Sequence, residues 1–193
     1  MLKAEINGIA LELDTHPTLF SPGGIDAGTR LLLRETRFHD DDKVLDLGCG
    51  YGVVGIVAAR TIGADRVTLL DVDPTAVAIS RENLVRNGVA AAQVVESDGF
   101  RDLDDAGYTL ILSNPPYHAD FAVPRHFIEK GFNRLVIGGR MLMVTRRRDW
   151  YRNKLRAIFG NVTERSADGY TVFIAVKRSP TRANVRKRAR QTR

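Results

Sequence analysis

The stretch of sequence that decides the fold runs from Val44 to Gly52 and reads VLDLGCGYG. Its first four residues are apolar except for Asp46, a pattern that is typical of a buried strand in a parallel sheet. Three glycines at alternate positions follow at once, and the apolar residues of a helix begin directly after them. Because glycine lets the backbone turn sharply and pass close to a ligand, this order predicts a strand, a ligand-binding loop and a helix.

Outward from this stretch, short β-type runs alternate with helical segments, which indicates an α/β fold with helices on both faces of a mostly parallel sheet. We expect core strands over residues 43–47, 66–70, 93–96, 108–112, 141–145, 162–165 and 170–177. We expect helices over residues 25–37, 53–62, 74–87, 149–159, and from near 124 to the glycine pair 138–139. The last two strands should pair antiparallel, because the hairpin signal Asp168-Gly169 joins them.

A small hairpin is expected before the sheet, over residues 3–13, with its turn at Asn7-Gly8. A loop over residues 21–24 follows it. We find no internal repeat and no second domain. The sequence therefore predicts one domain over residues 1–177, which includes the hairpin and loop of residues 1–24, and a tail over residues 178–193.

The composition is that of an ordinary globular protein, with 44% hydrophobic and 27% charged residues. No apolar run reaches membrane-spanning length and no signal peptide is visible, so we expect a cytoplasmic protein without a membrane partner. The single cysteine, Cys49, cannot form an internal disulfide. None of the four histidines has the spacing of a metal-ligand pair, so we expect no metal. The sequence does not indicate the oligomeric state.

The net charge of +6 is unevenly distributed. Residues 177–193 hold eight Lys or Arg and no acidic residue, so the rest of the chain, with 21 basic and 23 acidic residues, carries a net charge of −2. A basic tail on a nearly neutral body favours a polyphosphate partner such as RNA. The simpler interpretation of the tail is a solvated end of the chain.

Two interpretations compete for the glycine loop. Gly50, Gly52 and Gly55 fit the fingerprint of dinucleotide sites, in which backbone N–H groups face a diphosphate. The spacing Asp46-x-Gly48-x-Gly50-x-Gly52 instead fits the loop of methyltransferases that use S-adenosylmethionine. That cofactor has a sulfonium cation, an ammonium group and no phosphate, so a carboxylate beside the loop suits it. We therefore expect S-adenosyl-L-methionine.

Acidic residues at the ends of the next two strands suggest contacts to a nucleoside. Asp71 ends the second core strand, where a carboxylate can accept hydrogen bonds from both ribose hydroxyls of either cofactor. Val72 is placed to pack on a face of adenine. Asp98, which is followed by Gly99, could accept a hydrogen bond from the adenine amino group. The simpler interpretation of Asp98 is a turn or helix-capping residue.

The motif Asn114-Pro115-Pro116-Tyr117 follows the strand at 108–112 and indicates the chemistry. An amino or amide nitrogen is a poor nucleophile, because its lone pair is delocalised. The side-chain oxygen of Asn114 and the carbonyl of Pro115 can accept its protons, and Tyr117 can stack on a planar target such as an extruded base. Methylation of cytosine C5 would need a cysteine nucleophile, and Cys49 lies in the cofactor loop.

These motifs resemble the class I methyltransferases, and more closely their small-domain group, which includes the 16S ribosomal RNA guanine-N2 methyltransferases. The resemblance covers roughly residues 5 to 176, and the signature at 20–32, FSPGGIDAGTRLL, narrows the group. It implies a Rossmann-like, seven-stranded, mostly parallel sheet with an antiparallel terminal hairpin. It also implies that the loop from Phe20 to Thr29 covers the methionine end of the cofactor. The cofactor residues expected in all are Phe20, Thr29, Asp46, Gly48, Cys49, Gly50, Gly52, Asp71, Val72, Asp98, Gly99 and Asn114.

The sequence thus favours an N-methyltransferase acting on an exocyclic amino group of a base in RNA, with guanine N2 of ribosomal RNA first. Adenine N6, protein glutamine N5, and a non-catalytic RNA-binding assembly protein stay open as alternatives. A nicotinamide dehydrogenase is a distant further alternative. His118 could contact the target or be a plain surface residue. The cluster Arg146-Arg147-Arg148 could line the approach of RNA or be a solvated loop.

Overall fold

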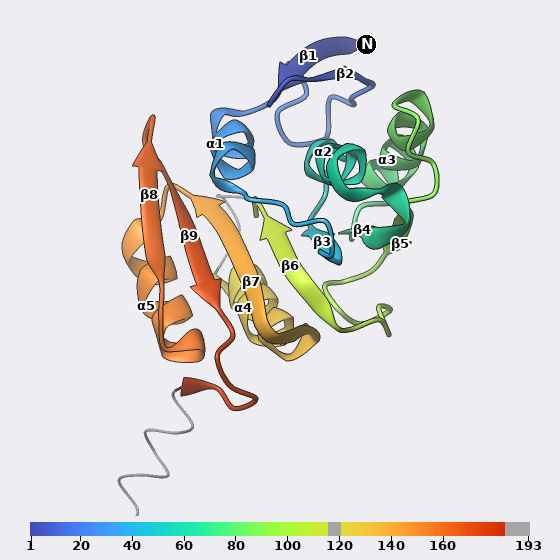
Figure 1. Ribbon diagram of the computed structural model, residues 1–193. Helices are drawn as coiled ribbons and strands as arrows, with labels where there is room; N and C mark the ends of the chain where they lie inside the picture. Colours follow the sequence, from blue (N-terminus) through green and yellow to red (C-terminus); the bar gives the residue numbers. More distant parts are fainter. Residues whose placement is uncertain (116–120, 184–193) are drawn as a thin grey trace, which may run out of the picture.

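The computed structural model describes residues 1–115 and 121–183 and consists of a seven-stranded sheet, five α-helices and a separate hairpin (Figure 1). The sheet has the order β5-β4-β3-β6-β7-β9-β8. Its strands are β3 (Val44–Leu47), β4 (Val67–Asp71), β5 (Gln93–Glu96), β6 (Tyr108–Ser113), β7 (Leu135–Thr145), β8 (Thr163–Ala167) and β9 (Tyr170–Val176). The first five of these pair in parallel, and β9 is antiparallel to both β7 and β8. The expected fold class is confirmed.

Helices cover both faces of the sheet. They are α1 (Ala27–Glu35), α2 (Val53–Ile62), α3 (Pro74–Arg86), α4 (Ala122–Arg134) and α5 (Arg148–Phe159), with a short 3-10 turn, η1 (Ala64–Arg66), before β4. One apolar core joins α1, α2, α3 and the hairpin to the sheet, and a second joins α4 and α5 to the opposite face (Figure 1). Because both faces are covered, the core strands are almost wholly apolar, as a parallel sheet requires.

The expected helix end at the glycine pair 138–139 is wrong. Helix α4 ends at Arg134, and Leu135 is already extended and pairs with Tyr108. The strand register then shifts, so that the next pair is Leu110 with Arg140. Gly138 has a φ of +90°, and its N–H donates to the Lys177 carbonyl at 2.7 Å. The glycines therefore form an irregularity within β7 rather than the cap of a helix.

The N-terminal hairpin of β1 (Leu2–Ile6) and β2 (Ile9–Leu13) turns at Asn7 and Gly8, as the sequence predicts. Both turn residues have positive φ, 51° and 77°, which is the geometry favoured by the twist of a two-residue hairpin. Helices α2 and α3 and the hairpin share one apolar core on the same face of the sheet (Figure 1).

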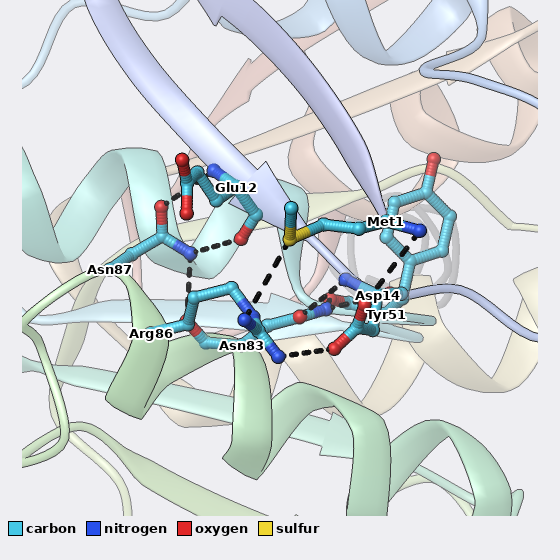
Figure 2. A network of polar contacts seen from close by, with 7 residues as sticks. All are labelled: Met1, Glu12, Asp14, Tyr51, Asn83, Arg86 and Asn87. Atoms are coloured by element: carbon cyan, nitrogen blue, oxygen red, sulfur yellow. Dashed lines mark hydrogen bonds and ion pairs between the residues drawn. The ribbon is translucent and has the colours of Figure 1, made fainter.

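Two asparagines, Asn83 in α3 and Asn87 at its C-cap, hold the hairpin in place (Figure 2). The side chain of Asn87 accepts from the Glu12 N–H at 3.1 Å and donates to the Glu12 carbonyl at 2.8 Å. Asn83, which is fully buried, makes the same pair of bonds with the Asp14 backbone, at 2.7 and 2.9 Å. Asn83 also donates to the Tyr51 carbonyl at 2.9 Å, so one helix face ties the hairpin to the glycine loop.

Two helical glycines, one in α2 and one in α4, allow a matched test of how the helices pack on the sheet. A Cβ at Gly55 would lie 2.4 Å from the branched carbon of Leu69, whereas one at Gly131 would meet chiefly the terminal methyl of Met141, at 2.3 Å. Both neighbouring side chains are buried, but the branch point of Leu69 cannot move aside, whereas the end of the flexible Met141 side chain can. We expect Gly55→Ala to lower the free energy of unfolding by about 1–3 kcal/mol in urea titrations, and Gly131→Ala to change it by less than about 1 kcal/mol. Equal effects would contradict this account.

Candidate active site

A cavity of about 300 Å³ opens at the carboxyl ends of β3, β4 and β6, beside the glycine loop. All the predicted cofactor residues line it except Gly52. Gly52 has a φ of +91° and begins α2, and a Cβ there would lie 3.1 Å from the hydroxyl of Ser80. Its lack of a side chain thus serves the turn and the contact between α2 and α3. Pro115 lies at the start of the loop after β6, and Pro116, Tyr117 and His118 lie outside the described residues.

The glycine loop wraps around the end of β4 through its own N–H groups. Gly48 and Cys49 both donate to the Leu70 carbonyl, at 2.8 and 3.0 Å, and Gly50 donates to the Asp71 carboxylate at 2.8 Å. Gly48 and Gly50 have φ of +77° and +56°, a region that favours glycine. The N–H groups of Gly48, Cys49 and Gly50 are therefore engaged within the protein and are not available to an anion.

Asp71 is oriented by the backbone on both sides. One carboxylate oxygen accepts from Gly50, and the other accepts from the Asp73 N–H at 3.1 Å. Burial raises the pKa of Asp71 above its usual value. The side chain stays partly accessible on the cavity wall, at the position that the sequence analysis expects for a ribose contact.

Asp46 has a structural role that the sequence analysis missed. Helix α2 begins at Gly52, which has no side chain to cap it, and the buried Asp46 carboxylate accepts from the Gly55 N–H at 2.8 Å instead. Burial, with a smaller contribution from the Asp71 carboxylate, raises the pKa of Asp46 to about 7. Asp26, Asp73 and Asp98 also line the cavity, and five acidic side chains give it a preference for a cationic ligand.

Asn114 extends from the end of β6 and is held by two residues, one at the N-cap of α1 and one in its first turn. Its side-chain nitrogen donates to the Asp26 carboxylate at 2.6 Å and to the Thr29 hydroxyl at 2.9 Å. Since a carboxylate only accepts hydrogen bonds, this contact fixes which end of the amide faces Asp26. The amide oxygen of Asn114 therefore lies on the side away from Asp26, and the residue lines the cavity.

Asp26 lines the cavity and contacts Asn114, but the sequence analysis gave it no role of its own. It is the N-cap of α1, and its carboxylate accepts from the N–H groups of Gly28 at 2.8 Å and Thr29 at 3.1 Å. The Thr29 hydroxyl also donates to it, at 3.0 Å. The sequence analysis expects this helix to begin at Ile25. With Asp26 as its cap, the helix instead begins at Ala27. An Asp three residues before a Thr at the start of an apolar run is a capping signal that could have identified it.

The loop before α1 reaches the cavity and is held by hydroxyl groups that donate to one of its backbone carbonyls. The Tyr51 hydroxyl donates to the Gly24 carbonyl at 3.2 Å, and the Ser21 hydroxyl donates to the same carbonyl at 2.7 Å. Three apolar side chains at the cavity are exposed: Phe20 is 43%, Val72 62% and Val123 38% exposed. Exposed apolar groups gathered at a cavity mark a ligand contact.

Asp98 lies at the outer rim. Its side chain is 71% exposed, and its carboxylate is 3.9 Å from the Arg101 guanidinium. The neighbouring Ser97 N–H donates to the Asp71 carbonyl at 2.9 Å, which sets this turn beside the end of β4. The suggested contact of Asp98 with an adenine amino group stays a prediction.

Within residues 1–115 and 121–183, no group of three or more His, Cys, Asp or Glu side chains could hold a metal ion. In the same part of the chain, no helix is both long enough and apolar enough to cross a membrane.

The sheet order, with a glycine loop after its first core strand and an asparagine after β6, is that of the Rossmann-like methyltransferases. The family model described as the methyltransferase small domain matches residues 10–174, and the chain belongs to this family.

Several named proteins are similar to this chain. The ribosomal RNA small subunit methyltransferase C of Pseudomonas putida is 36% identical over 170 residues, which are 86% of this chain and 51% of that protein. The ribosomal RNA large subunit methyltransferase G of Klebsiella pneumoniae is 31% identical, over 82% of this chain and 44% of that protein. The chain thus spans about half the length of the curated relatives it matches.

A solved structure shares the fold closely. The 16S rRNA N2 methyltransferase of T. thermophilus, in complex with AdoMet and guanosine, superimposes with a TM-score of 0.84 at 29% identity. The match covers 92% of this chain and 50% of that protein.

Proposed function

We propose that this chain binds S-adenosylmethionine and transfers its methyl group to an exocyclic amino nitrogen of a base in RNA, with guanine N2 of ribosomal RNA as the favoured acceptor. The observation that carries this proposal is the Asn114 amide, which Asp26 and Thr29 hold in one orientation at the cavity. The names of the relatives, which act on ribosomal RNA of both subunits, support the choice of RNA.

The cavity fits S-adenosylmethionine better than a dinucleotide. A diphosphate needs free backbone N–H groups, but those of Gly48, Cys49 and Gly50 are used within the protein. A cationic ligand instead gains from the carboxylates of Asp46 and Asp71. The exposed Val72 offers an apolar surface for adenine, and the Asp71 carboxylate has lone pairs left for ribose hydroxyls.

The chemistry assigned to the chain is orientation of the target nitrogen. When bound, S-adenosylmethionine supplies an electrophilic methyl group. The Asn114 oxygen and the Pro115 carbonyl accept hydrogen bonds from the amino group, which favours a pyramidal nitrogen with its lone pair directed at the methyl carbon. The nitrogen would gain the methyl group as the methyl–sulfur bond breaks and a neutral thioether leaves, and it would release one proton to solvent. Placement and electrostatics supply the rate, without a covalent enzyme intermediate. Tyr117 is proposed as the stacking partner of the base.

The direct test uses RNA from cells in which the gene for this chain is disrupted. The purified protein is incubated with this RNA and labelled S-adenosylmethionine, and the nucleosides are separated by mass spectrometry. We expect label in N2-methylguanosine. Label on protein with none on RNA would contradict the proposal and favour glutamine as the acceptor. Calorimetry with NAD and with S-adenosylmethionine tests the cofactor separately.

We propose that the basic tail adds to the affinity of the protein for RNA. We also propose that the protein acts in the cytoplasm. Residues 1–177 then form the catalytic domain, and residues 178–193 form the basic segment. In the described part of that segment, Arg182 donates to the Glu129 carbonyl at 2.7 Å and so lies against α4. Residues 184–193 lie outside the described residues.

The raised pKa of Asp46 makes cofactor affinity depend on pH. In the ligand-free protein, the Asp46 carboxyl has a pKa of about 7, so it is largely protonated below that pH. A cationic ligand favours the carboxylate, so binding must release this proton at lower pH. We expect the Kd for S-adenosylmethionine to rise by up to about tenfold for each pH unit below about 7. Calorimetry at several pH values between about 5.5 and about 8.5 measures this dependence of the Kd on pH.

Asp46→Asn is the matched control, because its amide oxygen can still accept from Gly55. This variant should bind S-adenosylmethionine more weakly at high pH and lose the pH dependence. Stability should change in the opposite sense: the folded-state pKa lies above the unfolded value of 3.8, so this carboxyl lowers the free energy of unfolding as pH rises from about 4 to about 7. Identical pH profiles of the wild type and the variant would rule out Asp46 as the group responsible.

A further inference from the structure

A second surface of arginines and aromatic rings lies on the same edge of the sheet as Asn114. Strands β6 and β7 run in parallel with Ser113 opposite Met143, and β7 ends at Thr145. Arg146 and the residues after it therefore leave the sheet on the side where Asn114 leaves β6. This placement puts the arginine run beside the proposed target site.

The rings and guanidinium groups of this surface are stacked in pairs. Phe121 lies flat on Trp150, with ring centres 4.4 Å apart and planes 18° apart, and the Arg147 guanidinium lies 4.9 Å from the Phe121 ring centre. The Arg146 guanidinium lies 4.5 Å from the centre of the Tyr170 ring. We call these five residues the arginine–aromatic surface; Tyr170 is itself buried, and the ring contact places Arg146 over it. Both arginines are exposed.

The third arginine of the run has a different role. Arg148 donates to the Glu164 carboxylate at 2.7 Å, and Arg152 donates to the other oxygen of the same carboxylate at 2.6 Å. Arg152 is also paired with Asp149, at 3.2 Å. Arg146, by contrast, has no ion pair with any residue in 1–115 or 121–183. The run thus divides into a salt-bridged Arg148 and an Arg146 whose charge is left for a partner.

We propose that the arginine–aromatic surface binds the nucleotides that adjoin the target base in RNA. A guanidinium laid on a ring can direct its N–H edges to phosphates, and a base can stack on the same arrangement of planar groups. Recognition of unpaired RNA uses such planes of aromatic rings and arginine. The inference rests on the proposed function and names the part of the chain that holds the substrate outside the cofactor cavity.

The test compares Arg146→Ala/Arg147→Ala with Arg148→Ala, using deproteinised small-subunit ribosomal RNA and labelled S-adenosylmethionine. We expect the double variant to raise the KM for RNA roughly tenfold and to reduce the slope of log KM against log salt by about two. Its kcat at saturating RNA and its Kd for S-adenosylmethionine should stay within about twofold of wild type. The Arg148→Ala variant should keep the wild-type KM.

Arg146→Lys/Arg147→Lys guards against loss of folding, because it keeps both charges and loses only the planar groups; an intermediate KM is expected. An unchanged KM in the double alanine variant would contradict the RNA-binding role of the arginine–aromatic surface and leave the proposed function standing. A wild-type protein that methylates no RNA would overturn both. Loss of protein methylation in the double variant, with no RNA methylation by the wild type, would assign the surface to an acidic protein.

Discussion

Replacing Asn114 with Ala is expected to lower kcat for methyl transfer by roughly 10²–10³-fold, while the Kd for S-adenosylmethionine stays within about threefold of wild type. In the proposed function, the amide oxygen of Asn114 accepts a hydrogen bond that strengthens only as the target nitrogen becomes pyramidal, so its loss is expected to act on the transition state. Single-turnover rates on RNA measure the chemical step, and calorimetry measures cofactor binding.

Thermal unfolding provides the control for Asn114→Ala. The side chain makes its bonds at the end of β6 and outside the apolar cores, so the variant should fold. Full methyl transfer by a folded Asn114→Ala protein would show that Asn114 has no role in the chemical step. Full biological function without methyl transfer would instead favour an RNA-binding assembly protein that only retains the cofactor cavity.

The parts of the fold that depend on local sequence were predictable. The helix at 53–62 and the strand at 93–96 have the expected bounds. Gly52 and Gly63 delimit the helix, and the strand is a short run around two valines. The hairpin turn at Asp168-Gly169 is confirmed, and these residues have φ of 52° and 76°. In each of these elements, the residues that determine the structure lie within the element or directly beside it.

What could not be predicted depends on partners far apart in the sequence. The glycine pair 138–139 has the composition of a helix stop, but the pairing of Leu135 with Tyr108 across 27 residues ends α4 earlier. The contact of Asp26 with Asn114 spans 88 residues. No pattern along the chain shows that the carboxylate that caps one helix also orients an amide on a distant strand.

Asp26→Asn is expected to reduce kcat roughly 10²-fold while changing the free energy of unfolding by only about 1 kcal/mol. Asparagine is as good an N-cap as aspartate, so much of the capping of α1 is kept. However, the new amide can present N–H groups to the Asn114 nitrogen, and two donors repel. The Asn114 amide then loses the partner that fixes its orientation, and its nitrogen competes with its oxygen for the position that faces the target.

A double-mutant cycle separates this positioning role from a general weakening of the fold. If Asp26 acts only through Asn114, then Asp26→Asn/Asn114→Ala has the kcat of Asn114→Ala alone. Independent effects would multiply and give a further loss of roughly 10²-fold in the double variant. Thr29→Ser is the conservative companion, since it keeps the hydroxyl that accepts from Asn114, and it should retain kcat within about threefold. A multiplicative cycle would mean that Asp26 contributes by some route other than orienting the Asn114 amide.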